Sequence, residues 1–249
     1  MTRPIIFLHL PKTGGQTIHH AIGRHVGEAN IGPYRLQAQV QDGTPFPPEY
    51  RFHSGHLDWT ELDTVAGDPF SFMVLRDPRE RLGSFFFFMQ EEARRALQAH
   101  GPDGIKPIHR ELLKGADAVF FSDREDIKFL VHRHWANLTL TYLATRSLLR
   151  RPIWDRTPLA EMLTRAEENS RALSAVYRFG DFEQLEQDLI PLLNARPDIA
   201  AKRSNPGPLQ QGISRWDRLL DRLDTDAHRH AMDQFVAEDI AVMERLTFR

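Results

Sequence analysis

The stretch Pro4–Thr17, PIIFLHLPKTGGQT, decides the fold of this chain. It opens with an apolar run at residues 5–8, which has the composition of a strand buried on both faces. A short turn from Pro11 to Thr17 follows the run. After the turn, apolar residues recur at helical spacing: Ile18, Ala21, Ile22 and Val26. The stretch therefore predicts a strand, a loop and a helix in that order.

The loop between this strand and this helix has the composition of an anion-binding cradle. A loop that ends at a helix N-terminus presents backbone N–H groups and the positive end of the helix dipole to one point. Gly14 and Gly15 let the backbone approach a ligand, and Lys12 supplies a mobile positive charge. The pattern is not a Walker A loop, in which the lysine follows the glycines. We expect a phosphate or sulfate ester here, with an ordinary glycine turn as the alternative.

Length and composition indicate an ordinary globular protein. The chain has 249 residues, of which 41% are hydrophobic and 27% charged, and we expect a single domain over residues 1–249. The net charge of −2 gives no global basic field, so we expect no nucleic-acid partner. The absence of cysteine excludes disulfides, zinc–thiolate sites and a cysteine nucleophile.

The sequence also lacks the marks of a targeting or membrane segment. The apolar run from Ile5 is too short for a signal peptide, and Pro11 ends it. No apolar stretch approaches the roughly 20 residues of a membrane span. We expect a soluble chain, with the cytoplasm as the default location.

The remaining pattern alternates strands and helices. Phe70–Leu75 is a strong strand candidate, followed by a helix from Pro78 with Asp77 as its cap. A short strand is expected at Ala175–Phe179. Further helices are expected at Asp123–Arg146 (mostly helical), Pro158–Leu173, Asp181–Leu193 with Asp181 as the cap, and Asp226–Leu246; residues 30–50 and 200–212 read as irregular. This order favours an α/β fold with a parallel sheet covered on both faces, in which ligands bind at the carboxyl ends of the strands.

A second chemical stretch follows the strand at Phe70–Leu75. Arg76 comes directly after the strand, and Ser84 lies further along the next helix. A guanidinium fork and a hydroxyl donor can converge on one phosphate group. We interpret Arg79 and Glu80 differently, as residues that form ion pairs on a solvated helix face.

A third stretch, FHSGHLDWTELD at residues 52–63, carries two histidines. Histidine is the side chain best suited to take a proton near neutral pH. The spacing of His53 and His56 also fits a metal pair, but no third ligand is evident nearby, so we expect no metal. A core position is the better interpretation of His53.

The three stretches together resemble the sulfotransferases that use PAPS (3′-phosphoadenosine 5′-phosphosulfate). Pro-Lys-Thr-Gly-Gly-x-Thr after a strand resembles their 5′-phosphosulfate loop, and LRDPRERLGSFF resembles their 3′-phosphate motif. The segment Gly-His-x-Asp-Trp-Thr-Glu-Leu at residues 55–62 resembles the catalytic-histidine segment of heparan sulfate 6-O-sulfotransferases.

This resemblance implies a fold, a reaction and a set of site residues. The fold is a P-loop NTPase-like three-layer sandwich, with a central parallel sheet flanked by helices. The reaction is transfer of a sulfuryl group from PAPS to an acceptor hydroxyl, leaving PAP, without a metal; a glycan is the expected acceptor. His56 matches the general base, and Lys12 the residue that stabilises the leaving phosphate. The 5′-phosphosulfate would lie on Lys12, Thr13, Gly14, Gly15, Gln16 and Thr17, the 3′-phosphate on Arg76 and Ser84, and the acceptor near Asp58 and Trp59. Trp59 could pack against a sugar ring, with a core position as an equal alternative.

Weaker similarities and other functions stay open. Asn137 resembles an acceptor contact of the family, although two neighbouring motif positions differ, and residues 202–205 (Lys-Arg-Ser-Asn) are either a flap over the donor or a plain loop. The run Phe85–Phe88 suits core packing, an acceptor cleft or a dimer interface. A P-loop-type kinase that uses ATP and Mg²⁺ and a non-catalytic module that binds PAP or another anion are the alternative functions. The sequence does not identify the acceptor or the oligomeric state.

Overall fold

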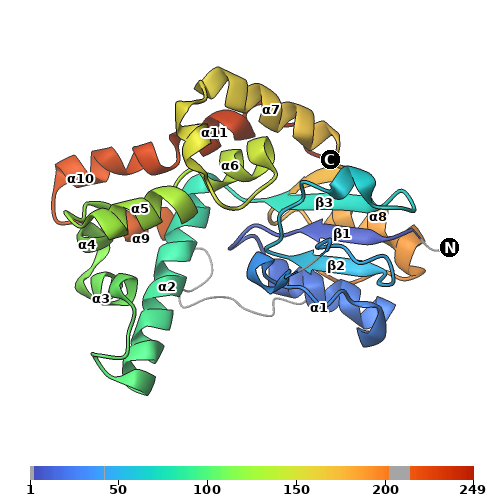
Figure 1. The fold of residues 1–249 in the computed structure, drawn as a ribbon, viewed down its shortest axis with the longest axis horizontal. Helices are drawn as coiled ribbons and strands as arrows, with labels where there is room; N and C mark the ends of the chain where they lie inside the picture. The colour runs from blue at the N-terminus through green and yellow to red at the C-terminus, as the bar shows by residue number, and fades with distance from the viewer. Residues whose placement is uncertain (1–2, 42, 202–213) are drawn as a thin grey trace.

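A parallel four-stranded sheet forms the centre of the molecule (Figure 1). The computed structural model describes residues 3–41, 43–201 and 214–249. The strands are β1 (Ile5–Leu8), β2 (Phe52–Gly55), β3 (Phe70–Leu75) and β4 (Ala175–Arg178). Their order in the sheet is β2-β1-β3-β4, and Ile5 pairs with Phe52 on one side and Phe70 on the other. The strands predicted near Ile5, Phe70 and Ala175 are confirmed.

Strand β2 is the one that sequence patterning did not predict. Its sequence, Phe-His-Ser-Gly, lacks the apolar run of β1 and β3, yet all of its residues are buried. It lies at an edge of the sheet and pairs with β1. The segment before it covers its open edge, because Ile31 forms a bridge with Phe52 and Leu36 with His56. An edge strand protected in this way does not need a continuous apolar sequence.

Helices cover both faces of the sheet. Because side chains alternate along a strand, Ile5 and Phe7 face one side, where they pack with apolar residues of α1 (Gly15–Val26) and α8 (Glu183–Leu193). Ile6 and Leu8 face the other side. There they pack with residues of α6 (Leu138–Thr145), α7 (Leu159–Arg171) and α11 (Ala237–Met243). The predicted α/β architecture with three layers is confirmed.

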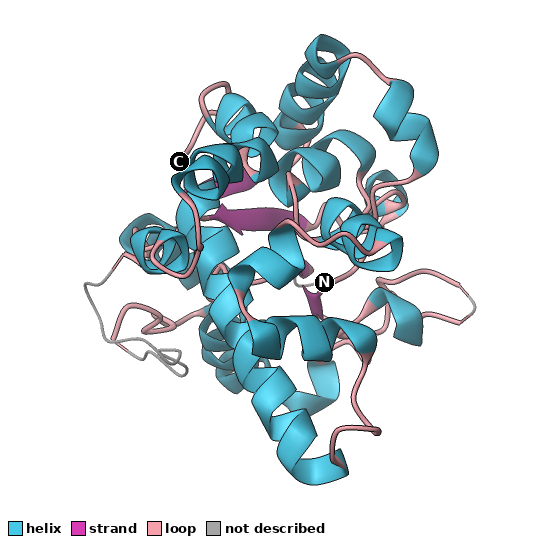
Figure 2. Ribbon diagram, turned by 90° about the vertical axis from the view of Figure 1, so that its left-hand side faces the viewer, coloured by secondary structure: helices cyan, strands magenta, loops and turns pink. Residues whose placement is uncertain are grey.

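A lobe of helices stands beside the sheet (Figures 1 and 2). Its members are α2 (Pro78–His100), α3 (Pro107–Lys114), α4 (Ala116–Phe120), α5 (Glu125–His134), α9 (Arg215–Leu220) and α10 (Asp226–Ala231). The lobe has its own apolar core, to which Phe86 and Phe87 contribute. Phe85 packs edge-on against Trp135 with ring centroids 4.9 Å apart. Core packing thus accounts for most of the aromatic run, whereas the Phe88 ring contacts the Lys12 ammonium.

The helix termini agree with the sequence expectations in part. Asp77 caps α2 as predicted, and its carboxylate accepts a hydrogen bond from the Glu80 backbone at 2.9 Å. Asp181 is not a cap, because α8 begins at Glu183 and Phe182 occupies the N-cap position. The helix expected over residues 123–146 is broken between α5 and α6, where Asn137 has a positive φ of 46°.

The last predicted helix is also interrupted. The predicted helix at 226–246 is instead α10, a 3₁₀ turn at Met232–Phe235 and then α11, which ends at Met243. Within the described ranges, no helix has both the length and the apolarity needed to cross a bilayer. The assignment of the whole chain to one domain stays a prediction.

Candidate functional site

The candidate site lies where the sheet order changes direction. The chain leaves β1 for β2 on one side, and β3 lies on the other side of β1. In open parallel sheets, ligands bind at the carboxyl ends of the strands on either side of such a switch point. The loop from His9 to Gly14 follows β1, and Arg76 follows β3. The two predicted phosphate-binding stretches therefore meet at the same edge of the sheet.

The loop after β1 is shaped by two left-handed residues. Lys12 has a φ of 71° and Gly14 a φ of 82°; a positive φ is common for glycine and unusual for lysine. The buried Thr13 hydroxyl donates to the Leu10 carbonyl at 2.9 Å and closes the turn. The Thr13 side chain therefore holds the loop, and a ligand contact from this residue would have to come from its backbone.

Helix α1 begins directly at the end of this loop. Its first intrahelical hydrogen bond runs from the Ile18 N–H to the Gly14 carbonyl at 3.2 Å. The N–H groups of Gly15 and Gln16 precede that bond, so they have no acceptor within the helix. The first turn contains no acidic residue, and no described side chain caps it. This end of α1 has the polarity and the donors that favour an anion.

Lys12 and Arg76 bring positive charge to this helix end. The Lys12 Nζ lies 4.2 Å from the centre of the Phe88 ring, and the Lys12 carbonyl accepts a hydrogen bond from Arg76 at 3.4 Å. Burial, followed by the charges of Arg76 and Arg215, lowers the pKa of Lys12 to about 8. Burial and Arg215 also lower the pKa of Arg76 to about 10. Like charges held this close favour an anion between them.

Arg215 was not predicted from the sequence. It is the first residue of α9, and its guanidinium lies 3.9 Å from the Glu80 carboxylate. Its charge acts on both Lys12 and Arg76, so the three side chains form a cluster, here called the cation cluster. No local sequence pattern marks Arg215 as a site residue, because it lies far from the other site residues in the sequence. It comes 138 positions after Asp77, the N-cap residue of α2.

Glu80 connects the parts of this cluster and is the second residue that sequence reasoning missed. Its carboxylate pairs with Arg76 at 3.0 Å. It also accepts hydrogen bonds from the Ser214 hydroxyl at 3.1 Å and from the backbones of Arg215 at 2.8 Å and Trp216 at 3.1 Å. These donors hold the pKa of Glu80 below its usual range in spite of partial burial. The interpretation of Glu80 as part of a solvated ion-pair face is therefore wrong, since the residue anchors α9 to α2 at the site.

Ser84 lies on the same row of α2 as Glu80 and Phe88. Residues four apart on a helix are neighbours on one face. Ser84 therefore lies between Glu80, which pairs with Arg76, and Phe88, whose ring contacts the Lys12 ammonium. Its side chain is largely buried. Ser84 thus shares a helix face with two residues that contact the cation cluster, and its role in phosphate binding stays a prediction.

His56 lies at the carboxyl end of β2. Its Nδ1 is 2.7 Å from the His9 carbonyl. Because a carbonyl only accepts, Nδ1 must carry the proton, and the neutral ring then has an unprotonated Nε2. Burial lowers the pKa of His56 below the usual value. The ring is therefore neutral near pH 7 and has the protonation state that a general base requires.

The rings of His9 and His56 connect the base to the loop. They are stacked with centroids 4.4 Å apart and an angle of 27° between their planes. The His9 ring also lies directly over Gly15 in the first turn of α1. His56 and the anion-binding end of α1 are thus separated by one imidazole ring.

The two residues predicted to meet the acceptor have structural roles instead. The Trp59 side chain is 0% exposed, and its Nε1 donates to the Tyr142 carbonyl at 3.2 Å. A ring buried in this way cannot stack on a sugar. The Asp58 carboxylate accepts from the Ser147 hydroxyl at 2.9 Å and the Leu148 N–H at 3.0 Å, so it holds that turn. For both residues, the expected acceptor contact is replaced by a contact within the protein.

Asn137 is also structural. Its amide oxygen accepts from the backbone N–H groups of Glu238 at 3.1 Å and Asp239 at 3.3 Å, and its amide nitrogen donates to the Gln234 carbonyl. These bonds fasten the start of α11, which explains an asparagine here without an acceptor. The possible flap formed by Lys202, Arg203, Ser204 and Asn205 lies outside the described residues.

Phe179 is a third residue that the sequence did not single out as a site residue. It follows β4 at the same edge of the sheet, and its ring is 39% exposed. The Arg76 guanidinium lies 4.9 Å from the ring centroid. The ring also borders Gly14, where an added Cβ would approach it to 3.0 Å. Phe179 therefore orients Arg76 beside the loop.

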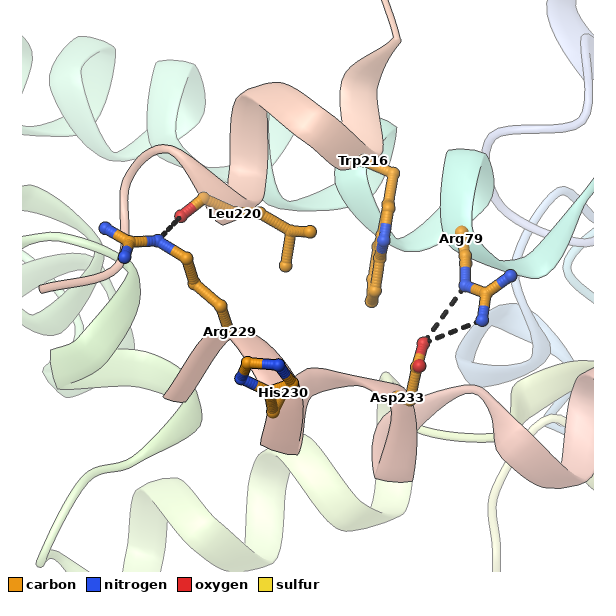
Figure 3. A pocket seen from close by; sticks show the side chains of 6 residues that line it. All are labelled: Arg79, Trp216, Leu220, Arg229, His230 and Asp233. Carbon is orange, nitrogen blue, oxygen red and sulfur yellow. Dashed lines mark hydrogen bonds and ion pairs between the residues drawn. The ribbon is translucent and has the colours of Figure 1, made fainter. Parts of the chain in front are cut away.

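A separate pocket of about 360 Å³ lies between α2, α9 and α10. Figure 3 shows its lining, which includes cationic side chains and the Trp216 ring. Arg79 pairs with Asp233 at 3.0 Å, and Arg229 donates to the Leu220 carbonyl at 3.2 Å and pairs with Asp226. The cations of this Trp216 pocket are each neutralised, unlike Lys12. Over the described residues, no group of His, Asp or Glu side chains is arranged to hold a metal ion.

Comparisons with known proteins find remote similarity among solved structures. No protein-family profile matches the sequence, and no curated protein sequence matches it. Among solved structures, the chain is similar to a sulfotransferase from Alicyclobacillus acidocaldarius. The two are 13% identical over 99% of this chain and 98% of that chain, with a TM-score of 0.38. A similarity this remote does not assign an activity.

Proposed function

We propose that this protein is a sulfotransferase that moves the sulfuryl group of PAPS to an acceptor hydroxyl. The observation that supports this most strongly is the meeting of two features at one edge of the sheet. The cation cluster of Lys12, Arg76 and Arg215 lies at the open N-terminus of α1, and a neutral histidine base lies one ring away. Arg76 and Arg215 share the Glu80 carboxylate, and Lys12 has no carboxylate partner among the described residues, so the cluster suits a ligand with several negative groups.

The donor would be held by two parts of the site. The N–H groups at the start of α1 and the Lys12 ammonium would take the 5′-phosphosulfate. Arg76 and Ser84, from the strand end and the helix α2, would take the 3′-phosphate. When bound, PAPS supplies an activated sulfuryl group on its 5′-phosphate. The similarity of these two loops to the 5′-phosphosulfate and 3′-phosphate motifs agrees with this division.

The residues of this chain then supply proton transfer and charge stabilisation. The His56 Nε2 accepts the proton of the acceptor hydroxyl, while its Nδ1–H stays on the His9 carbonyl. A bond forms between the acceptor oxygen and sulfur as the bond from sulfur to the bridging phosphate oxygen breaks. Negative charge grows on that oxygen in a loose transition state. Lys12 and the α1 N–H groups face this charge and would stabilise it more than the ground state.

The acceptor proposed is a glycan hydroxyl. This part rests on the similarity of residues 55–62 to the heparan sulfate 6-O-sulfotransferase segment. Asp58 and Trp59 no longer support it, because both are engaged within the protein. What remains from that segment is His56 itself.

Calorimetric titration with PAP tests the donor assignment. We expect PAP to bind the wild-type protein and ATP with Mg²⁺ not to bind. The Arg76→Ala variant should lose about 10- to 100-fold in PAP affinity, as expected for one charge-assisted contact. Arg79→Ala is the matched control, because Arg79 lies three positions along and pairs with Asp233 outside the cation cluster; its PAP affinity should stay unchanged.

Three results would contradict the proposal. They are a wild-type protein that does not bind PAP, a preference for ATP with Mg²⁺, or equal losses of PAP affinity in Arg76→Ala and Arg79→Ala. The second would point to a kinase. PAP binding without transfer to any hydroxyl of a glycan panel, measured with labelled PAPS, would favour a binding module.

A further inference from the structure

His9 occupies an unusual position between the base and the helix that would bind the donor. Its side chain is 7% exposed, and its Nε2 is buried with no hydrogen-bond partner among the described residues. A buried imidazole nitrogen without a partner costs free energy. Its ring packs against Phe7, with centroids 5.3 Å apart, on the strand side. A position this unfavourable for a polar ring calls for an explanation beyond packing.

The first contact of the ring is with Gly15. A Cβ added at Gly15 would lie 1.9 Å from both Cε1 and Nε2 of His9, and its three nearest atoms all belong to that ring. Gly15 is the first residue of α1 and does not have a positive φ. Alanine would therefore be acceptable to the backbone. The glycine at this position is required by the His9 ring, and not by the turn, which Gly14 provides.

The second contact of His9 is with His56. The two rings are stacked, and the His9 carbonyl accepts the His56 Nδ1–H at 2.7 Å. The same residue therefore fixes the plane of the base through its ring and the tautomer of the base through its backbone. Burial lowers the pKa of His9 well below the usual value, and the nearby charges of Arg35 and Lys12 add to this effect. The ring is neutral and adds no charge to the site.

We propose that His9 is a positioning residue whose ring, held between Gly15 and His56, sets the distance and orientation of the base relative to the first turn of α1. The inference deepens the proposed function and rests on it. His9 does not touch the reacting atoms in this scheme. It transmits the position of the donor loop to the base through direct contact between rigid groups.

A double-mutant cycle tests this contact. In Gly15→Ala the new methyl group must displace the His9 ring, so turnover should fall by about 10-fold or more for a misplaced base. His9→Ala should also lower turnover while leaving the affinity for PAP within about threefold. In the combined variant the methyl group fills the space left by the ring. The double variant should then be no slower than His9→Ala alone, a non-additivity typical of residues in contact.

Rescue by an isosteric ring separates positioning from general stability. His9→Phe keeps a flat ring between Gly15 and His56 and keeps the backbone carbonyl, so it should recover much of the turnover that His9→Ala loses. Nitrogen NMR of the histidine rings gives a readout that does not need activity. The wild type should show His56 protonated at Nδ1, and Gly15→Ala should shift the His56 signals without ligand.

The outcomes distinguish this inference from the proposed function. Turnover in His9→Ala within twofold of the wild type would overturn it. So would an equal loss from Gly15→Ala in the wild-type and His9→Ala backgrounds, or His56 signals that Gly15→Ala leaves unchanged. If His9→Ala fails to fold, the single Gly15→Ala variant and its NMR spectrum decide. Failure of the wild type to bind PAP would instead contradict the proposed function, while the NMR comparison would still test the contact.

Discussion

The cation cluster and the Trp216 pocket are two collections of basic side chains that both include residues of α9. In the pocket, Arg79 pairs with Asp233 and Arg229 with Asp226. In the cluster, Arg76 and Arg215 share Glu80, and Lys12 has no carboxylate partner within residues 3–41, 43–201 and 214–249. Burial and neighbouring cations lower the pKa of Lys12 to about 8. Exposed ion pairs such as those of the pocket contribute little to the stability of the fold. The Lys12 charge, which has no such partner in the described part of the chain and lies next to the uncapped start of α1, indicates a binding site instead.

The two regions also offer a matched pair of histidines, and this pair carries the largest expected effect. The Nδ1 atoms of His56 and His230 each lie 2.7 Å from a backbone carbonyl, but His56 is partly buried beside the cluster and His230 is exposed. His56→Ala should lower turnover by about 10² to 10⁴ because the base is lost. PAP affinity, measured by calorimetry, should stay nearly intact.

His230→Ala is the control and should transfer sulfate at the wild-type rate. Equal turnover in His56→Ala and His230→Ala would remove His56 from the chemistry. Loss of PAP binding in His56→Ala would show that the residue holds the donor site instead.

A similar comparison applies to lysines. Lys12→Ala should lower turnover by about 10²-fold, the effect of losing one group that stabilises a developing oxyanion. Lys128→Ala removes an exposed lysine that pairs with Glu125 at 2.9 Å, and it should have no effect. Initial rates with labelled PAPS measure both. A Lys12→Ala variant with normal turnover would contradict the role given to the cluster.

The lowered pKa of Lys12 predicts a pH dependence of PAP affinity. Below its pKa of about 8 the ammonium is charged and attracts the anion; above it the free protein carries neutral Lys12. PAP affinity should therefore fall as the pH rises above about 8, by at most tenfold for each pH unit. Calorimetry across this range measures the slope.

The Lys12→Ala variant provides the control for this profile, because its PAP affinity should show a flatter dependence between pH 7.5 and 9.5 (about the window set by that pKa). An unchanged slope in the variant would assign the titration to another group.

The smallest effect is expected in the Trp216 pocket. Arg79 and Asp233 are 43% and 56% exposed, so a double-mutant cycle of Arg79→Ala and Asp233→Ala should give a coupling free energy below about 1 kcal/mol. Thermal or urea unfolding measures it. A coupling several times larger would show that the pocket has a structural importance that its exposure does not suggest.

Local sequence patterns predicted the parts of the fold that depend on local chemistry. Apolar runs marked β1 and β3, and Asp77 before Pro78 marked the start of α2. The same patterns predicted that Lys12 and Arg76 meet, because parallel strands end at one edge. Strand β2 escaped detection since its residues include histidine, serine and glycine, and its burial comes from the segment that covers its edge.

The parts of the site that could not be predicted depend on contacts between distant segments. Glu80 looked like a surface charge because its partners, the backbones of Arg215 and Trp216, are not marked by residue type. The sequence left Trp59 open between sugar stacking and a core position, because burial against Tyr142 depends on how α6 packs. Gly15 looked like a ligand-approach glycine until the position of the His9 ring gave another reason for it.

The link from Glu80 to Ser214, Arg215 and Trp216 has a consequence for how the site is assembled during synthesis. The carboxylate on α2 completes its hydrogen bonds only with a segment near the end of the 249-residue chain. A nascent chain can build β1, α1 and β3 much earlier, yet it lacks both Arg215 and the backbone that fixes Glu80. Contacts of such long sequence separation form late and slowly. The proposed nucleotide recognition would therefore arise only after residues 214–216 have been synthesised and have packed against α2.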